Sequence, residues 1–216
     1  MSAKEQSVIR EFDLAGLNKE CQEYFLELGS NPPREIWADN IANYISKVKR
    51  PLEGQIGRYT GISFFEAINR IASDLILWYG LEILINNILR TRQIDTVGLC
   101  LGNENVKDKG DFWIKMKGEQ ECRNGEAFNA ATSFFRPKMS YTMGKWEKKE
   151  QPLHYIFCNA DGYPGRYEPT GVTEWSPGQE IRDSDATTLL IKIDLSKTMY
   201  DGSEIRIPVF RGTHSV

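Results

Sequence analysis

Residues 108–139, DKGDFWIKMKGEQECRNGEAFNAATSFFRPKM, contain the change in hydrophobic periodicity that decides the fold. Apolar and polar residues alternate through DFWIKMK (111–117), a period of two that is typical of a half-buried β-strand. Gly118 supplies a turn, and QECRNGEAFNA (120–130) returns as a partner strand. The sequence therefore predicts a hairpin or a meander in this part of the chain.

Helical spacing returns directly after the predicted hairpin, in residues 131–150. Because proline is tolerated only in the first turn of a helix, Pro137 favours a helix that begins near Phe135 or Arg136. Three more helices are predicted before the hairpin, over residues 8–28, about 34–48, and 63–90. The last of these is the longest and most apolar, so we expect it to pack centrally against a sheet.

Short apolar runs bounded by turn residues predict the remaining strands, over residues 96–102, 153–160, 187–195 and 204–210. Pro208 interrupts the last run, which favours an edge position for that strand. Residues 52–62 are predicted as a loop, and 160–185 as a long surface excursion rich in Gly and Pro. This order predicts an α/β (α+β) fold with a mixed central β-sheet flanked by helices.

The length of 216 residues suits a single domain. We divide it into an N-terminal helical segment (1–60), a core (61–160), and a loop with C-terminal strands (161–216). Hydrophobic residues make up 40% and charged residues 26%, which is ordinary for a globular protein and argues against wholesale disorder. The net charge of −3 neither indicates nor excludes a nucleic-acid binder, because a basic cleft can coexist with acidic surface.

Targeting signals and membrane spans are not expected. The first residues, MSAKEQSVIREFD, lack the apolar centre of a secretory signal. The longest apolar window, 75–89, is too short and too polar to cross a bilayer. Four scattered cysteines and two histidines offer neither a zinc pattern nor an obvious disulfide framework. We therefore expect a cytoplasmic protein with reduced thiols and no membrane partner.

Two acids occupy the predicted hairpin, and their chemistry suggests a metal site. Asp111 heads the first strand and Glu126 lies in the second, so two carboxylates can meet across one strand spacing. The backbone carbonyl of Ala127 offers a third oxygen, and hard divalent cations such as Mg²⁺ prefer oxygen ligands. A lysine such as Lys138 can orient a water molecule and offset the charge of a phosphate. This set fits metal-assisted phosphodiester hydrolysis.

The arrangement of a strand, a strand that begins with Gly-Asp, an acidic strand and a helix resembles the PD-(D/E)XK fold of restriction endonucleases, over roughly half of the chain. By that resemblance Asp111 is the motif aspartate and Glu126 the second acid. Phe128 holds the usual lysine position, so the resemblance implies that Lys138 on the following helix replaces that lysine. An acid on the preceding helix assists in some members, and Glu66 is the candidate here.

The resemblance implies a Mg²⁺-dependent endonuclease that cuts double-stranded DNA with one or two ions, of the type II restriction class. A palindromic site implies a homodimer, because two-fold symmetry in the DNA is matched by two-fold symmetry in the protein. Expected DNA contacts are basic or aromatic side chains at the end of the predicted helix over 131–150 and in the long excursion 160–185: Lys145, Lys148, Tyr163, Arg166 and Arg182.

Simpler interpretations of the same residues remain open. Asp111 can be a turn residue at the start of a strand, and Glu126 can be a cross-strand partner of Lys115 or Lys117. Asp108 and Glu121 are rival acids in the same stretch. A non-catalytic α/β binding or regulatory module is the alternative function, and a small-molecule enzyme with its pocket under residues 160–185 is a third.

Overall fold

The computed structural model describes residues 9–30, 40–51, 54–89, 94–102, 104, 106–179 and 187–211. Its elements, in chain order, are β1 (Arg10–Phe12), α1 (Leu14–Ser30), α2 (Ile41–Lys49), β2 (Gln55–Ile56), β3 (Tyr59–Thr60), α3 (Phe64–Ile83), a π-helical turn η1 (Leu84–Ile88), β4 (Ile94–Leu99), β5 (Phe112–Met116), β6 (Cys122–Phe128), α4 (Thr132–Glu147), β7 (Leu153–Asn159), β8 (Val172–Glu174), β9 (Thr188–Ile193), α5 (Leu195–Thr198), β10 (Tyr200–Asp201) and β11 (Glu204–Ile205).

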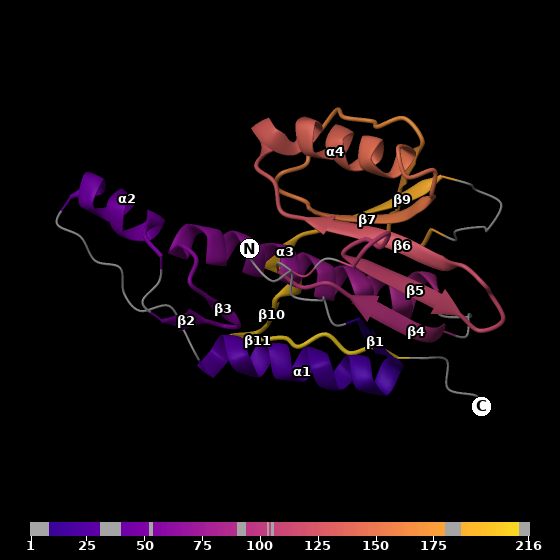
Figure 1. Ribbon diagram of the computed structural model, residues 1–216, viewed down its shortest axis with the longest axis horizontal. Coiled ribbons are helices and arrows are strands. Elements are labelled where there is room, and N and C mark those ends of the chain that lie inside the picture. The colour runs from indigo at the N-terminus through magenta and orange to yellow at the C-terminus, as the bar shows by residue number, and fades with distance from the viewer. Residues whose placement is uncertain are drawn as a thin grey trace, which may run out of the picture.

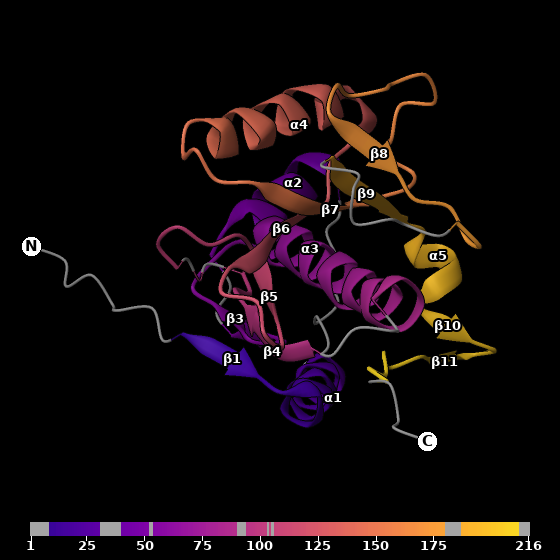
Figure 2. The same ribbon diagram turned by 90° about the vertical axis from the view of Figure 1, so that its right-hand side faces the viewer.

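A seven-stranded mixed sheet forms the centre, in the order β1-β4-β5-β6-β7-β9-β8. The strands from β1 to β6 pair antiparallel, and β6, β7, β9 and β8 pair parallel. Figures 1 and 2 show α4 on one side of the parallel half and α3 on the other, with α1 beneath the antiparallel half. The fold is therefore a mixed α/β sheet flanked by helices, as predicted.

Two cores lie on the two faces of this sheet. The larger packs α1 and α3 against inward side chains of β4, β5, β7 and β9, and the smaller packs α4 against β6, β7 and β9. The smaller core is centred on Phe128, Phe135 and Trp146, which are almost completely buried. Side chains of β6 pack into both cores, Ala127 into the larger and Phe128 into the smaller, so the strand that carries Glu126 is held on both faces of the sheet.

The long helix α3 begins where its sequence signal predicts. Ser63 caps it by accepting a hydrogen bond from the backbone N–H of Glu66 at 3.2 Å. Gly80 lets α3 approach β7, because a Cβ there would lie 2.3 Å from the ring of Phe157. The stretch 64–88 is long and apolar enough to cross a bilayer, but more than half of its most apolar part is buried against the sheet and its neighbours. Its apolar surface is thus used in the core.

The N-terminal segment is not purely helical, which corrects the prediction for residues 8–28. Residues 10–12 form β1, which extends the sheet beyond β4. Asp13 stops the strand and starts α1, because its side chain accepts the N–H of Gly16 at 2.7 Å and its carbonyl that of Leu17 at 2.8 Å. Within the predicted loop 52–62, β2 and β3 form a small hairpin. The predicted helix over 34–48 falls partly outside the described residues, and α2 covers its later part.

Residues 204–210 are not an edge strand of the main sheet, so that prediction was wrong. Only Glu204 and Ile205 are in a strand, and they pair with β10. The residues that follow run extended beside α1 (yellow in Figure 1). Their backbone N–H groups reach side-chain oxygens instead of a neighbouring strand: Val209 donates to Glu82 at 3.1 Å and Phe210 to Asn18 at 2.9 Å. Side chains of the helices therefore satisfy this backbone.

The helix after the hairpin begins earlier than predicted, at Thr132, and Pro137 lies inside it. Proline removes one backbone hydrogen bond there, yet the early start places Phe135 in the smaller core, 5.6 Å from Phe128 and 5.0 Å from Tyr163 between ring centroids. Burial of this ring offsets the lost bond. The predicted excursion 160–185 also contains β8, the far edge of the sheet.

Candidate active site

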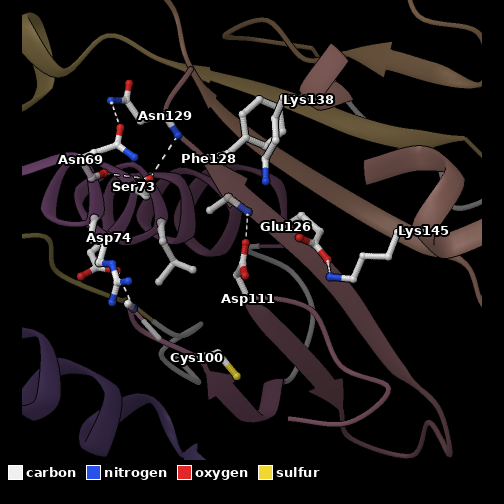
Figure 3. A pocket seen from close by; sticks show the side chains of 14 residues that line it. Asn69, Ser73, Asp74, Cys100, Asp111, Glu126, Phe128, Asn129, Lys138 and Lys145 are labelled. Carbon is white, nitrogen blue, oxygen red and sulfur yellow. Dashed lines mark hydrogen bonds and ion pairs between the residues drawn. The ribbon is translucent and has the colours of Figure 1, made fainter. Parts of the chain in front are cut away.

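A pocket of about 300 Å³ opens where β6 runs on past the start of β5, between the first half of α3 and α4. Asp111, Glu126, Lys138 and Lys145 line it (Figure 3). The pocket thus brings together the two acids that the sequence singled out, together with two lysines from the following helix.

Asp111 is held by backbone contacts at the head of β5. Its carbonyl accepts the N–H of Cys100 at 2.7 Å, and its Oδ2 accepts the N–H of Ala127 at 2.8 Å. The N–H and C=O of one strand residue point to the same side of the strand. The Ala127 carbonyl therefore points to the side of β6 on which Asp111 lies, just before the first residue of β5.

Gly110 makes this placement possible. A Cβ at this position would lie 2.0 Å from the carbonyl oxygen of Gly125, a backbone atom of β6. We expect Gly110→Ala to push the chain away from β6, to displace Asp111, and to cost roughly 1–3 kcal/mol of stability. Thermal unfolding measures the loss, and Gly29→Ala is the control because its Cβ meets nothing within 4 Å. Equal melting temperatures for the two variants would contradict this account.

Glu126 is buried, with 5% of its surface exposed, and faces α4. Its Oε1 accepts hydrogen bonds from Lys145 Nζ at 2.7 Å and from Trp146 Nε1 at 2.8 Å. Its partner is therefore Lys145 on α4 and not Lys115 or Lys117, the cross-strand alternatives. Both donors reach the same oxygen, so on the described part of the chain Oε2 is the oxygen left to a ligand.

Ionisation of Asp111 is unfavourable in this pocket, because the carboxyl is buried and a second carboxylate, Glu126, lies nearby. Burial raises the pKa of Asp111 to about 7, and the neighbouring charge of Glu126 adds to this effect. The Ala127 N–H, Lys145 and Lys138 offset part of the shift. A buried acid beside a second carboxylate favours either the protonated form of Asp111 or a bound cation.

The donors that Asp111, Glu126 and the Ala127 carbonyl could offer to a cation are all oxygens. Among the described residues, no group of three or more His, Cys, Asp and Glu side chains gathers to hold an ion. Asp111, Glu126 and the Ala127 carbonyl would supply three oxygens. Mg²⁺ is commonly held by one or two carboxylates, with substrate phosphate oxygens and water completing its shell.

Lys138 and Lys145 approach the acids from α4. In Figure 3 the Lys138 ammonium points toward the space between Phe128 and the carboxylates, and its Nζ lies 5.6 Å from the Phe128 ring centroid. The sequence assigned Lys145 to the DNA backbone, whereas the structure pairs it with Glu126. Seven residues separate the two lysines, which places them on one helix face, so the spacing could have revealed the second lysine.

Glu66 does not join the site, in contrast to its predicted role. It forms an ion pair with Arg70 one turn along α3, and it is not among the residues that line the pocket. The α3 side chains that do line it include Asn69, Arg70 and Ser73, and Asn69 and Ser73 accept hydrogen bonds from Asn129. Arg70 Nη1 is buried without a hydrogen-bond partner, which leaves one donor of this guanidinium unsatisfied.

Asp74 is a buried acid in the pocket wall that sequence reasoning did not assign to the site. Its Oδ2 accepts hydrogen bonds from the hydroxyls of Tyr24 and Tyr59, and its Oδ1 accepts the N–H of Gly102 at 3.2 Å. Burial raises its pKa to about 6, although these three donors lower it. With its oxygens occupied, Asp74 ties α1, β3 and α3 to the residues that follow β4.

The raised pKa of Asp74 predicts a pH dependence of stability. Between about pH 4 and pH 6 the unfolded chain releases this proton and the folded chain keeps it, so the free energy of unfolding falls as pH rises. The loss amounts to about 2–3 kcal/mol and is complete above pH 6. Asp74→Asn should flatten this part of the profile in urea unfolding, relative to the exposed control Asp95→Asn. If the free energy of unfolding depended on pH in the same way for wild type and Asp74→Asn, Asp74 would not be the source of this pH dependence.

The other predicted DNA contacts lie outside the pocket. Lys148 and Arg166 are exposed, and Arg182 lies outside the described residues. Tyr163 is used internally: its ring packs on Phe135, and its hydroxyl donates to the carbonyl of Tyr167. Of the rival acids, neither Asp108 nor Glu121 lines the pocket; both are exposed.

Comparison with known proteins finds no matching protein-family model, no similar curated protein and no similar solved structure.

Proposed function

We propose that this protein is a Mg²⁺-dependent endonuclease that hydrolyses phosphodiester bonds in double-stranded DNA, of the type II restriction class, with a PD-(D/E)XK arrangement of its site. One observation carries the proposal: Asp111 and Glu126, from adjacent strands, share a pocket with the lysines Lys138 and Lys145. A structural ion pair explains Glu126 and Lys145 but leaves the burial of Asp111 beside a second acid unexplained.

The order of elements supports this proposal. Helix α3 precedes three antiparallel strands, β4, β5 and β6, and α4 then leads to β7, which pairs parallel with β6. The acids lie at the head of the second strand and inside the third. Phe128 occupies the usual place of the lysine, and the proposal gives that role to Lys138, whose ammonium lies 5.6 Å from the centroid of the Phe128 ring.

Each residue of the pocket would have a distinct role in hydrolysis. Asp111, Glu126 and the Ala127 carbonyl would hold Mg²⁺, which supplies an acidified water and a polarised phosphate. Lys138 would orient the attacking water and stabilise the negative charge that develops on the phosphate. Arg70, which also lines the pocket, would offset the charge of the phosphate.

Supercoiled plasmid incubated with the purified protein tests the proposal. With Mg²⁺ we expect nicked and linear products, and with a chelator none. Binding of Mn²⁺ or Ca²⁺ should also raise the melting temperature, because an ion that binds only the folded state stabilises it. A protein that neither cuts DNA nor responds to divalent ions would overturn the assignment and favour a non-catalytic module.

The homodimer is part of the same proposal, because recognition of a palindromic duplex by one chain requires two copies. A measured mass of twice 24.7 kDa in solution is the expected result, in the presence or absence of DNA.

A further inference from the structure

The outward face of α4 carries two aromatic rings in line with the pocket lysines. Phe134, Lys138, Tyr141 and Lys145 follow one another at intervals of four, three and four residues, which places all four on one stripe of the helix. We refer to these four residues as the α4 stripe.

Packing does not account for the two rings. Phe134 and Tyr141 are each 69% exposed, whereas the buried face of α4 is formed by other residues: Phe135, Met139, Thr142 and Trp146. Two large, exposed aromatic side chains that alternate with lysines are therefore available to a ligand.

We propose that the α4 stripe is a stacking subsite for unpaired nucleobases next to the phosphate bound in the pocket. The inference rests on the proposed function, and it adds that the strand to be cut is locally unpaired next to the scissile bond within the double-stranded substrate, at the cost of unstacking a base. Aromatic rings bind bases of any sequence by stacking. Lys138, exposed between the two rings, can neutralise a backbone phosphate, whereas Lys145 is already paired with Glu126.

The dimensions and charges favour this occupant over a protein partner. The two rings are about 10 Å apart along the helix axis, with Lys138 between them, by the usual rise of α-helical residues. Lys138 and Lys145 both reach into the pocket that holds the acids, so a strand lying on the stripe would have its phosphate directed to the site. A base-paired duplex cannot present its ring faces to Phe134 and Tyr141, because neighbouring base pairs cover them.

Fluorescence anisotropy with labelled 30-base-pair DNA in a chelator, where no cleavage occurs, tests the proposal. One probe is fully paired, and the other has the same sequence with a central bubble of four mismatches that contains 2-aminopurine. We expect wild-type protein to bind the bubble at least about tenfold more tightly, with quenched 2-aminopurine fluorescence. Phe134→Ala and Tyr141→Ala should each weaken binding to the bubble on the order of tenfold and leave binding to the paired probe unchanged.

The controls separate stacking from loss of structure. Phe134→Trp should retain the preference for the bubble, because it keeps an aromatic face. Tyr200→Ala removes another exposed ring, on β10, and should have no effect. Equal affinity of wild-type protein for the two probes would overturn the proposal. So would an equal loss on both probes in the alanine variants, or a concentration-dependent self-association that those variants abolish.

Failure of this inference can be told from failure of the proposed function. Mg²⁺-dependent cleavage of plasmid and of the bubble probe is measured with the same preparations. Cleavage without any preference for the bubble overturns the stacking subsite alone. Absence of cleavage on every substrate overturns the nuclease assignment, and the stacking subsite with it.

Discussion

Asp111→Asn is expected to abolish Mg²⁺-dependent cleavage, by at least about 10³-fold, and at the same time to raise the melting temperature above pH 7. The asparagine oxygen can still accept the Ala127 N–H, so the local geometry is retained. What is lost is one charged ligand, and metal-assisted charge stabilisation is worth several kcal/mol in the transition state.

The gain in stability follows from the pKa of about 7 for Asp111. In the unfolded chain this carboxyl ionises near pH 4, so above that pH the folded state must either keep the proton or hold a buried charge beside Glu126. The amide removes that cost. A residue whose replacement stabilises the fold and destroys activity is serving function and not structure.

Asp108→Asn is the matched control. Asp108 is an exposed acid in the same loop with a positive φ of 61°, a conformation that asparagine tolerates well. We expect unchanged cleavage and an unchanged melting temperature for this variant. If Asp111→Asn cut plasmid as fast as Asp108→Asn does, Asp111 would not be a metal ligand.

Local patterns predicted the strands that carry the site. The alternation in 111–117 and the return in 120–130 became β5 and β6, with Phe112 opposite Gly125 in the observed register. Gly125 permits this pairing, because a Cβ there would collide with the Phe112 ring at 2.0 Å. Hydrophobic periodicity and turn chemistry depend on residues that are close together in the chain, so both can be recognised from the sequence alone.

Contacts between distant segments were not predictable in the same way. The hydrogen bonds of Asp74 join residues from α1, β3 and α3, and nothing in the spacing of Tyr24 or Tyr59 indicates that they meet. The extended segment after β11 has apolar residues that suggest a strand, yet its backbone is satisfied by Glu82 and Asn18. Such outcomes depend on which surfaces the whole fold brings together.

Glu66 shows how a local rule can mislead. Its position three residues after Ser63 predicted the cap of α3 correctly. The same residue was assigned to catalysis because it leads a polar stripe, but the turns that face the pocket come later, at Asn69, Arg70 and Ser73. The position of the sheet decides which turns of α3 face the pocket. The sequence of the helix alone does not specify that position.

The two lysines of the pocket are expected to respond differently to loss of their charge. Lys138→Met should lower cleavage by about 10²- to 10⁴-fold, the usual worth of a positioned proton-transfer or charge-stabilising group. Its melting temperature should stay near that of wild type, because Lys138 is exposed and the Phe128 ring is a weak partner for its ammonium.

Lys145→Met should instead destabilise the protein, by roughly 1–3 kcal/mol, because the buried carboxylate of Glu126 would keep only its bond from Trp146. For a chain of this size the melting temperature would fall by about 2–4 °C per kcal/mol. Its cleavage should also fall, because Lys145 holds the Glu126 side chain in place.

Lys19→Met, at an exposed position of α1, controls for loss of a positive charge and should change neither quantity. Cleavage at pH 8 and differential scanning fluorimetry on the three variants give the comparison. A Lys138→Met protein that retains full activity, beside a Lys145→Met protein that is folded and inactive, would assign the catalytic ammonium to Lys145. The role of the motif lysine would then belong to the residue that already touches Glu126, and Lys138 would be left to contact the substrate backbone.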